Sequence, residues 1–216
     1  MQLAEKYRPK ALAEIVGQDK ACATVQRFID RGELGGRAYW VQGPSGTGKT
    51  TLARIIANTL ADDWFIHEQN AGELGVADVR AMESGWRLYA SGKGGRAWIV
   101  NEGHGMSGAV CRAFLTALEP GNVPAHVAVI FTTTIEGMDL FGEKQGDAHP
   151  LFSRCTPIRL TGQGLAQPFA ARLREIADAE GLNGQPVAKY LRLVQECKNN
   201  MRAALQRIEC GEMLTT

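Results

Sequence analysis

Residues 43–50 read Gly-Pro-Ser-Gly-Thr-Gly-Lys-Thr, which fits the pattern G-x-x-x-x-G-K-[ST] of a phosphate-binding loop. Glycines let the backbone curl so that successive N–H groups face phosphate oxygens. Lys49 then offers a positive charge to the β- and γ-phosphates, and the Thr50 hydroxyl can ligate Mg²⁺. The sequence therefore predicts a site for a nucleoside triphosphate with Mg²⁺, built from the loop and the residue after it: Gly43, Pro44, Ser45, Gly46, Thr47, Gly48, Lys49, Thr50 and Thr51.

The segments on both sides of the loop support this interpretation. Residues 38–41, Ala-Tyr-Trp-Val, form a short apolar run typical of a buried strand, and apolar residues recur at helical spacing from Leu52 to Leu60. A strand, a loop and a helix in this order place the phosphate at a helix N-terminus, where unpaired N–H groups and the helix dipole favour an anion. A chance glycine-rich turn would not need these flanks.

Length and composition set limits on the protein. Its 216 residues, 44% of them hydrophobic, suffice for one large core and a small second one. The net charge of +1 gives no overall basic field, so any contact with nucleic acid would depend on a local patch. The five cysteines and four histidines are scattered, which favours neither a zinc site nor a disulfide framework. With no apolar run near the roughly 18 residues that span a bilayer, we expect a soluble, cytoplasmic protein.

The order of the predicted elements indicates an α/β fold. Helical patterns separate most of the strand-like runs, and Asp19, Asp78 and Ser107 are candidate N-caps of three of these helices. Strands that alternate with helices favour a parallel sheet covered by helices on both faces. The five predicted strands are residues 38–41, 64–69, 97–100, 127–133 and 157–160.

After the last predicted strand the pattern changes to helical periodicity alone. Three helices are expected there, marked by apolar residues within 169–176, 187–194 and 201–208. We therefore predict a nucleotide-binding α/β domain over residues 1–160 and a small helical lid domain over residues 165–216.

A second motif follows the apolar run 97–100. It ends in Asn101-Glu102, at the place where phosphate-loop ATPases carry the acidic residues of the hydrolytic site. Glu102 is placed to orient and polarise the attacking water. Asn101 occupies the position of the aspartate that helps to fix the Mg²⁺ shell; its amide oxygen can accept a hydrogen bond but brings no negative charge. We therefore expect slow turnover, and expect Asn101→Asp to raise the rate or lower the Mg²⁺ requirement. An ordinary Asn-Glu turn is the alternative.

Several further segments resemble the clamp-loader branch of the AAA+ ATPases, which includes replication factor C small subunits and bacterial clamp-loader motor subunits. The likeness extends over nearly the whole chain. The segments are Glu-Lys-Tyr-Arg-Pro-Lys at 5–10 with Ile-Val-Gly-Gln at 15–18, Gln-Asn-Ala at 69–71 with Val-Arg at 79–80, Asn-Glu-Gly-His-Gly-Met-Ser at 101–107, Leu-Phe-Ser-Arg-Cys at 151–155 and Asn-Met-Arg-Ala-Ala-Leu at 200–205.

The resemblance implies roles for individual residues. Thr133 falls at the first sensor, with its neighbours Thr132 and Thr134 as alternatives if the alignment slips by one. Arg154 matches the finger that reaches the γ-phosphate in a neighbouring subunit, and Arg202 would contact the nucleotide from the lid. A threonine-rich strand end and surface arginines are the alternatives. Five residues would border the adenine: Tyr7, Arg8, Pro9, Val16 and Gly17.

The resemblance is incomplete in two further respects. The chain ends soon after the predicted second-sensor helix, so no collar domain of the clamp-loader kind is expected within it. The stretch 136–149 is longer than the family pattern and rich in glycine and acidic residues. Asn70 is a weaker candidate for a residue that holds Glu102 inactive.

On these grounds the expected protein is an AAA+ ATPase that uses ATP and Mg²⁺ and acts as an oligomer in DNA replication or repair. The expected partners are other AAA+ subunits, DNA, through Arg80 and Arg112, and a sliding clamp or another DNA-bound protein. Two alternatives remain open. One is an ATP-dependent binding switch with little turnover because of Asn101. The other is a motor of the branch-migration or fork-maintenance type.

Overall fold

The computed structural model describes residues 1–134 and 148–214. The stretch 136–149, which the sequence marked as unusually long, lies almost entirely outside the described residues, so that expectation stays a prediction. In the part of the chain that is described, no helix has the length and apolar character needed to cross a bilayer.

The centre of the fold is a five-stranded sheet in the order β2-β3-β4-β1-β5, with every adjacent pair parallel. This confirms the predicted α/β class. The three inner strands are buried almost throughout, as expected where helices cover both faces of a parallel sheet. The strands are β1 (Arg37–Gln42), β2 (Ile66–Asn70), β3 (Arg96–Asn101), β4 (Val127–Thr133) and β5 (Cys155–Arg159).

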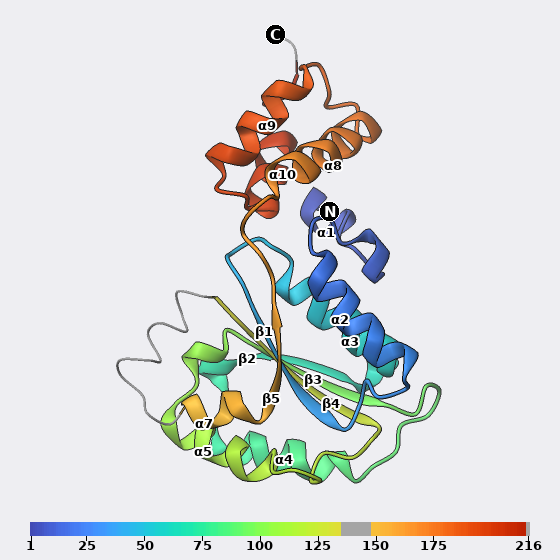
Figure 1. The fold of residues 1–216 in the computed structure, drawn as a ribbon, viewed down its shortest axis with the longest axis vertical. Helices are drawn as coiled ribbons and strands as arrows, with labels where there is room; N and C mark the ends of the chain where they lie inside the picture. Colours follow the sequence, from blue (N-terminus) through green and yellow to red (C-terminus); the bar gives the residue numbers. More distant parts are fainter. Residues whose placement is uncertain (135–147, 215–216) are drawn as a thin grey trace.

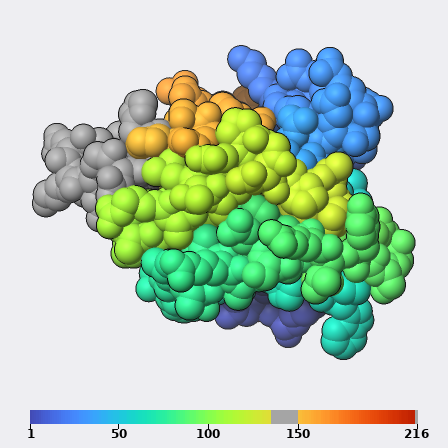
Figure 2. Space-filling model, turned by 90° about the horizontal axis from the view of Figure 1, so that it is seen from below, coloured from blue at the N-terminus to red at the C-terminus, as the bar shows by residue number. Residues whose placement is uncertain are grey.

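Helices on the two faces enclose two separate cores (Figure 1). Because side chains alternate along a strand, β1 sends Trp40 into one core and Tyr39 into the other. Seen from below, α4 and α5 form much of the surface (Figure 2). The first core lies under α4 (Val76–Trp86), α5 (Gly108–Ala117) and α7 (Ala148–Ser153), and the second lies under α2 (Asp19–Asp30) and α3 (Lys49–Leu60).

A third core joins the C-terminal helices to the start of the chain. It lies between α8 (Ala166–Ala179), α9 (Val187–Glu196) and α10 (Met201–Glu209), beyond one end of the sheet (Figure 1). The short N-terminal helix α1 (Leu3–Lys6) contributes Leu3 to this core. The three predicted helices are therefore present. The predicted boundaries at 160 and 165 stay predictions, and the sequence did not indicate that the N-terminal segment packs with the C-terminal helices.

Only one of the three predicted N-caps is confirmed. The Ser107 hydroxyl accepts a hydrogen bond from the N–H of Val110 at the start of α5. The other two predictions are wrong, because α2 begins at Asp19 itself, and α4 begins before Asp78. The Asp78 carboxylate instead accepts a hydrogen bond from the N–H of Gly75, at 2.8 Å. Acidic side chains are favourable both at the cap and within the first turn, so residue type alone does not separate the two positions.

Core substitutions test whether the sheet and the C-terminal helices unfold separately. Ile130 and Leu173 are both fully buried, in the second and third cores respectively. We expect Ile130→Ala and Leu173→Ala each to lower the free energy of unfolding by about 2–5 kcal/mol. If the predicted domains are independent, Leu173→Ala increases amide hydrogen exchange in α8–α10 and leaves exchange in β1, β3 and β4 unchanged. Faster exchange throughout the chain would contradict the division.

Gly17 tests the contact between the N-terminal segment and α8. Gly17 and Gly164 share a φ of +72°, but a Cβ on Gly17 would lie 2.6 Å from Leu165 Cδ2, whereas one on Gly164 would meet nothing within 4 Å. We expect Gly164→Ala to cost about 1–2 kcal/mol from the backbone alone, and Gly17→Ala about 1–3 kcal/mol more, because Leu165 is buried. Urea denaturation measures both, and equal losses would contradict the argument.

Candidate nucleotide-binding site

The phosphate-binding loop occupies the position that the sequence predicts, between the end of β1 and the start of α3. Gly46 and Gly48 have φ values of +74° and +102°, which residues that carry a side chain rarely adopt. Gly48 is the N-cap of α3, so the unpaired N–H groups of the first helical turn lie directly after the loop. The loop thus has the backbone shape and the helix terminus that bind an anion.

Lys49 is 8% exposed and donates a hydrogen bond from Nζ to the carbonyl of Pro44, at 2.9 Å. Thr47 Oγ1 donates to the same carbonyl at 2.8 Å. These two bonds hold the loop closed on itself. They also keep the Lys49 ammonium inside the loop.

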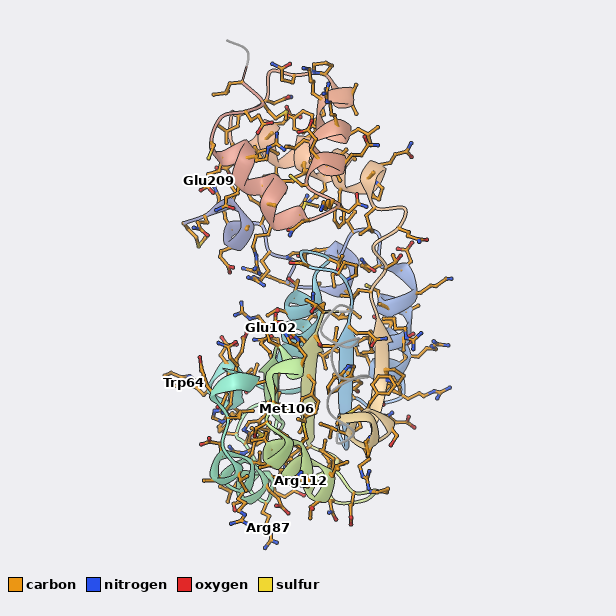
Figure 3. The ribbon with its side chains drawn as sticks, turned by 90° about the vertical axis from the view of Figure 1, so that its left-hand side faces the viewer. Trp64, Arg87, Glu102, Met106, Arg112 and Glu209 are labelled. Carbon is orange, nitrogen blue, oxygen red and sulfur yellow. The ribbon has the colours of Figure 1, made fainter. Side chains whose placement is uncertain are left out.

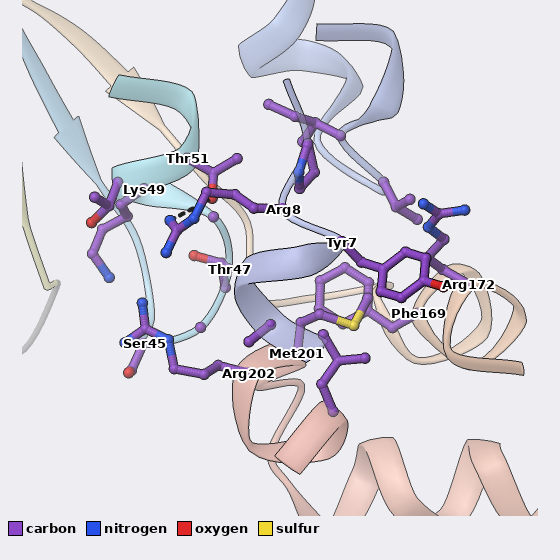
Figure 4. Close-up of a pocket in the computed structure, with 18 of the residues that line it drawn as sticks. Tyr7, Arg8, Ser45, Thr47, Lys49, Thr51, Phe169, Arg172, Met201 and Arg202 are labelled. Carbon is purple, nitrogen blue, oxygen red and sulfur yellow. Dashed lines mark hydrogen bonds between the residues drawn. The ribbon is translucent and has the colours of Figure 1, made fainter. Parts of the chain in front are cut away.

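An open cavity extends from the loop to the C-terminal helices (Figure 4). One end is polar and is lined by loop residues with Glu102 and Arg202; the other is largely apolar. This division matches the two ends of a nucleotide, the phosphates and the base. The lining includes most of the predicted nucleotide contacts: Tyr7, Arg8, Pro9, Val16, Ser45, Gly46, Thr47, Gly48, Lys49, Thr50, Thr51 and Arg202.

Sequence reasoning missed part of the apolar end. Phe169, Ile176, Met201 and Leu205 of α8 and α10 line it together with Ile15. The sequence marks most of these residues only as apolar positions of helices. Which of them face the cavity depends on how the helices pack over the N-terminal segment.

The N-terminal segment is tied to both sides of the cavity. Arg8 Nη1 donates to Thr51 Oγ1 of α3 at 3.3 Å, the dashed contact of Figure 4. On the other side, Lys6 Nζ lies 2.6 Å from Glu180 Oε1, which also accepts a hydrogen bond from the Tyr7 hydroxyl. These hydrogen bonds, from Lys6 first and then Tyr7, lower the pKa of Glu180. The segment therefore bridges α3 and the end of α8.

Asn101 at the end of β3 lies beside the phosphate-binding loop. Its Oδ1 accepts hydrogen bonds from Thr132 Oγ1 at 2.8 Å and Thr50 Oγ1 at 3.4 Å. Its Nδ2 donates to Glu68 Oε1 at 2.7 Å. The predicted metal-site pair Thr50 and Asn101 is therefore brought together, with Glu68 as a third member that the sequence did not indicate.

Glu102 follows in the left-handed region, with φ 54° and ψ 48°. Such a backbone is unfavourable for a glutamate and is typical of functional positions. The side chain is exposed and lines the polar end of the cavity, at the end of the sheet that faces the C-terminal helices (Figure 3).

His104 is a neighbour of Glu102 that sequence reasoning missed. Its Nδ1 lies 3.5 Å from Glu102 Oε2 and 3.2 Å from Thr133 Oγ1. His104 therefore links the predicted water-activating carboxylate to the end of β4. Its place in the segment 101–107 was the available signal.

Of the two neighbouring threonines at the predicted first-sensor position, Thr134 lines the cavity and Thr133 does not. Thr133 is fully buried and its hydroxyl lies against His104 and the Thr134 carbonyl, whereas Thr134 lines the cavity. Thr133 is the last residue of β4, and Thr134 is the first residue after the strand. The role of Thr133 as the first sensor stays a prediction. The geometry favours the alternative in which the alignment is shifted by one residue, to Thr134.

The loop and the lid touch directly. The N–H of Met201 donates to the Gly46 carbonyl at 3.3 Å, and Asn200 caps α10 through the N–H of Ala203. A Cβ on Gly46 would lie 2.0 Å from Asn200 Oδ1, so only glycine fits here. This contact brings the next residue, Arg202, to the polar end of the cavity.

The remaining predicted residues lie away from the cavity. Arg154 is exposed between α7 and β5, where its Nη1 donates to the Pro150 carbonyl at 3.2 Å. Arg80 and Arg112 are exposed on α4 and α5, with Arg112 toward the opposite end of the sheet from Glu102 (Figure 3). Asn70 donates to Glu73 at 3.3 Å rather than to Glu102. Gly43, Pro44 and Gly17 do not line the cavity either, although Pro44 and Gly17 each adjoin a residue that does.

Comparison with known proteins agrees with this geometry. A family model described as the TIP49 P-loop domain matches residues 2–85. The chain is 28% identical over 213 residues to the replication factor C large subunit of Methanothrix thermoacetophila, covering 96% of this chain and 43% of that protein. It is 33% identical over 159 residues to DNA polymerase III subunit gamma/tau of Mycobacterium tuberculosis, covering 62% of this chain and 27% of that protein. The chain thus spans less than half the length of these relatives.

Solved structures show the same fold. The RuvB Holliday junction branch migration motor of Thermotoga maritima aligns with a TM-score of 0.71 at 23% sequence identity, over 94% of this chain and 64% of that one. The likeness extends over nearly the whole chain and shows that the two proteins share a fold. The chain therefore has the P-loop α/β fold of these structures, and over nearly its whole length its sequence is similar to a replication factor C subunit.

Proposed function

We propose that this chain binds ATP with Mg²⁺, hydrolyses it, and works as one subunit of an oligomeric AAA+ assembly that acts on DNA in replication. The observation that carries the proposal is the cavity, whose lining combines the phosphate-binding loop, the Glu102 carboxylate and Arg202 with apolar residues of α8 and α10.

The residues at the polar end suit a magnesium nucleotide. Mg²⁺ prefers oxygen ligands and usually takes only one or two from the protein, the rest coming from phosphates and water. The Thr50 hydroxyl would supply a direct ligand, and the Asn101 amide oxygen beside it would hold a metal-bound water. Bound Mg²⁺ would offset the negative charge of the phosphates. Lys49 would leave the Pro44 carbonyl and donate to the β- and γ-phosphates.

The chain also has groups for the hydrolytic step. Glu102 would orient and polarise the attacking water, with the Thr134 or Thr133 hydroxyl holding that water or the γ-phosphate. Arg202 would contact the phosphates from the lid. Arg154 lies outside the cavity, so it would act on the nucleotide of a neighbouring subunit. A transition state that carries charge on the γ-phosphoryl oxygens is stabilised by such arginines.

The clamp-loader class is favoured because the relatives named above are subunits of replication factor C and of DNA polymerase III. Other AAA+ subunits, DNA and a sliding clamp are the partners that this class would require, and Arg80 and Arg112 are the proposed DNA contacts. Slow turnover is proposed because Asn101 carries no charge. A binding switch and a branch-migration motor remain the competing functions, and the first of them is an outcome of the next test.

Two substitutions separate binding from hydrolysis. We expect Lys49→Ala to weaken ATP·Mg²⁺ binding about 10–100-fold, because a hydrogen bond to a charged group contributes about 1.5–3 kcal/mol. We expect Glu102→Gln to keep binding and to lower the hydrolysis rate by about 10²–10⁴. Nucleotide titration and steady-state phosphate release, with and without primed DNA, measure the two effects.

The controls for this pair are Lys20→Ala and Glu83→Gln, which change exposed residues on α2 and α4. Equal binding by the wild type and Lys49→Ala would refute the nucleotide site. Normal binding without hydrolysis in the wild type would identify the chain as a switch.

Mixing two inactive variants tests whether Arg154 acts between subunits. Glu102→Gln and Arg154→Ala should each be nearly inactive alone, since a finger arginine contributes about 10³–10⁵ in rate. In a mixture, some interfaces pair an intact Glu102 with an intact Arg154, so part of the activity should return. Arg31→Ala serves as the control for loss of an exposed arginine. Full activity of Arg154→Ala alone would show that Arg154 is a surface residue.

A further inference from the structure

Glu68 of β2 contacts both a neighbouring strand and a helix at the metal side of the site. Its Oε1 accepts the hydrogen bond from Asn101 Nδ2 at 2.7 Å, and its Oε2 accepts one from Arg54 Nε of α3, also at 2.7 Å. The Glu68 side chain is 26% exposed, although the residue as a whole lies at the surface. Both carboxylate oxygens are therefore engaged, and the bond to Asn101 is charge-assisted.

This contact determines which way the Asn101 amide faces. The NH₂ end is held by the carboxylate, so the oxygen end is directed at Thr132 and Thr50. A carboxylate that accepts from an amide also increases the negative partial charge on the amide oxygen, because successive hydrogen bonds polarise one another. The negative charge on Glu68 thereby increases the electron density on the Asn101 oxygen that faces Thr50.

We propose that Glu68 is a positioning residue that provides, through the Asn101 amide, the negative charge that Asn101 itself lacks at the magnesium side of the site. The inference rests on the proposed function, since it concerns the same Mg²⁺·ATP site. In this arrangement Glu68 carries the negative charge and Asn101 contacts the metal side of the site. The charge is therefore one residue further from the metal than it would be with an aspartate at position 101. Partners at this distance from a metal typically alter affinity or activity about 10–100-fold.

The pair changes what is expected of Asn101→Asp. From the sequence alone, an added aspartate improves the metal site. In the structure its second oxygen would replace Nδ2, 2.7 Å from Glu68 Oε1, and two carboxylates at that distance cannot both be ionised without strong repulsion. We therefore expect Asn101→Asp alone to weaken the site and to improve it only when Glu68 is neutral.

A charge exchange across the pair is the test, made with Glu68→Gln, Asn101→Asp and the double variant. The readout is the magnesium gain, defined as the ratio of ATP affinity in Mg²⁺ to ATP affinity in EDTA, with hydrolysis measured beside it. Each single variant should lower the gain about 10–100-fold and leave affinity in EDTA nearly unchanged. The double variant should return it to within a few-fold of the wild type, because the new amide at position 68 can donate to the new carboxylate at position 101.

Glu83→Gln is the matched control for the loss of an exposed carboxylate, and melting temperatures monitor folding. If Glu68→Gln does not fold, Arg54→Gln replaces it. Removing the guanidinium leaves the Glu68 carboxylate less neutralised, so the magnesium gain should be kept or increased.

The proposal is overturned if Glu68→Gln keeps the wild-type magnesium gain, if the double variant is no better than the singles, or if Arg54→Gln lowers the gain as much as Asn101→Asp does. Wild-type protein that binds ATP with the usual magnesium gain while these results are obtained would leave the proposed function intact. Wild-type protein that binds no nucleotide would overturn both.

Discussion

The parallel pairing of β1 with β4, and of β4 with β3, determines where each polar group of the site lies. Because parallel strands all end at the same edge of the sheet, the phosphate-binding loop after β1, Asn101 and Glu102 at the end of β3, and the threonines at the end of β4 meet there. The inner strands are apolar on both faces, and their successive side chains pack alternately into the two cores. This packing holds the strand ends in place. The chemistry of the site thus depends on strand order as much as on its own residues.

The second constraint is the packing of the chain's two ends. Leu3 lies in the core of the C-terminal helices, and the Met201 N–H donates to the Gly46 carbonyl in the loop. The N-terminal segment therefore forms one wall of the cavity and α10 another, while the loop forms its floor (Figure 4). The cavity is thus built from parts that lie far apart in the sequence.

Much of the site was predictable because its signals are local. The loop pattern, the run of buried strand residues before it and the residue pair after β3 each depend on a few consecutive residues, and each appears in the expected element. Predictions that depend on how a side chain is oriented in the fold were less accurate. Residues 132–134 could not be separated by type, since all three are threonines, and only the structure shows that Thr134, just after β4, lines the cavity. Acidic residues near helix starts likewise could not be assigned to the cap or the first turn.

The sequence by itself determined the α/β class and the phosphate-binding loop, because spacing along the chain encodes them directly, and it contains segments that resemble those of clamp-loader ATPases. Only the tertiary structure decided that Glu68 contacts Asn101, that His104 lies against Glu102, and that the N-terminal segment packs with the C-terminal helices. These contacts depend on which strands are neighbours, how they are paired in register and which helix faces point inward. A single sequence contains no record of that pairing, since Glu68 and Asn101 belong to different strands and nothing in their local patterns points to each other.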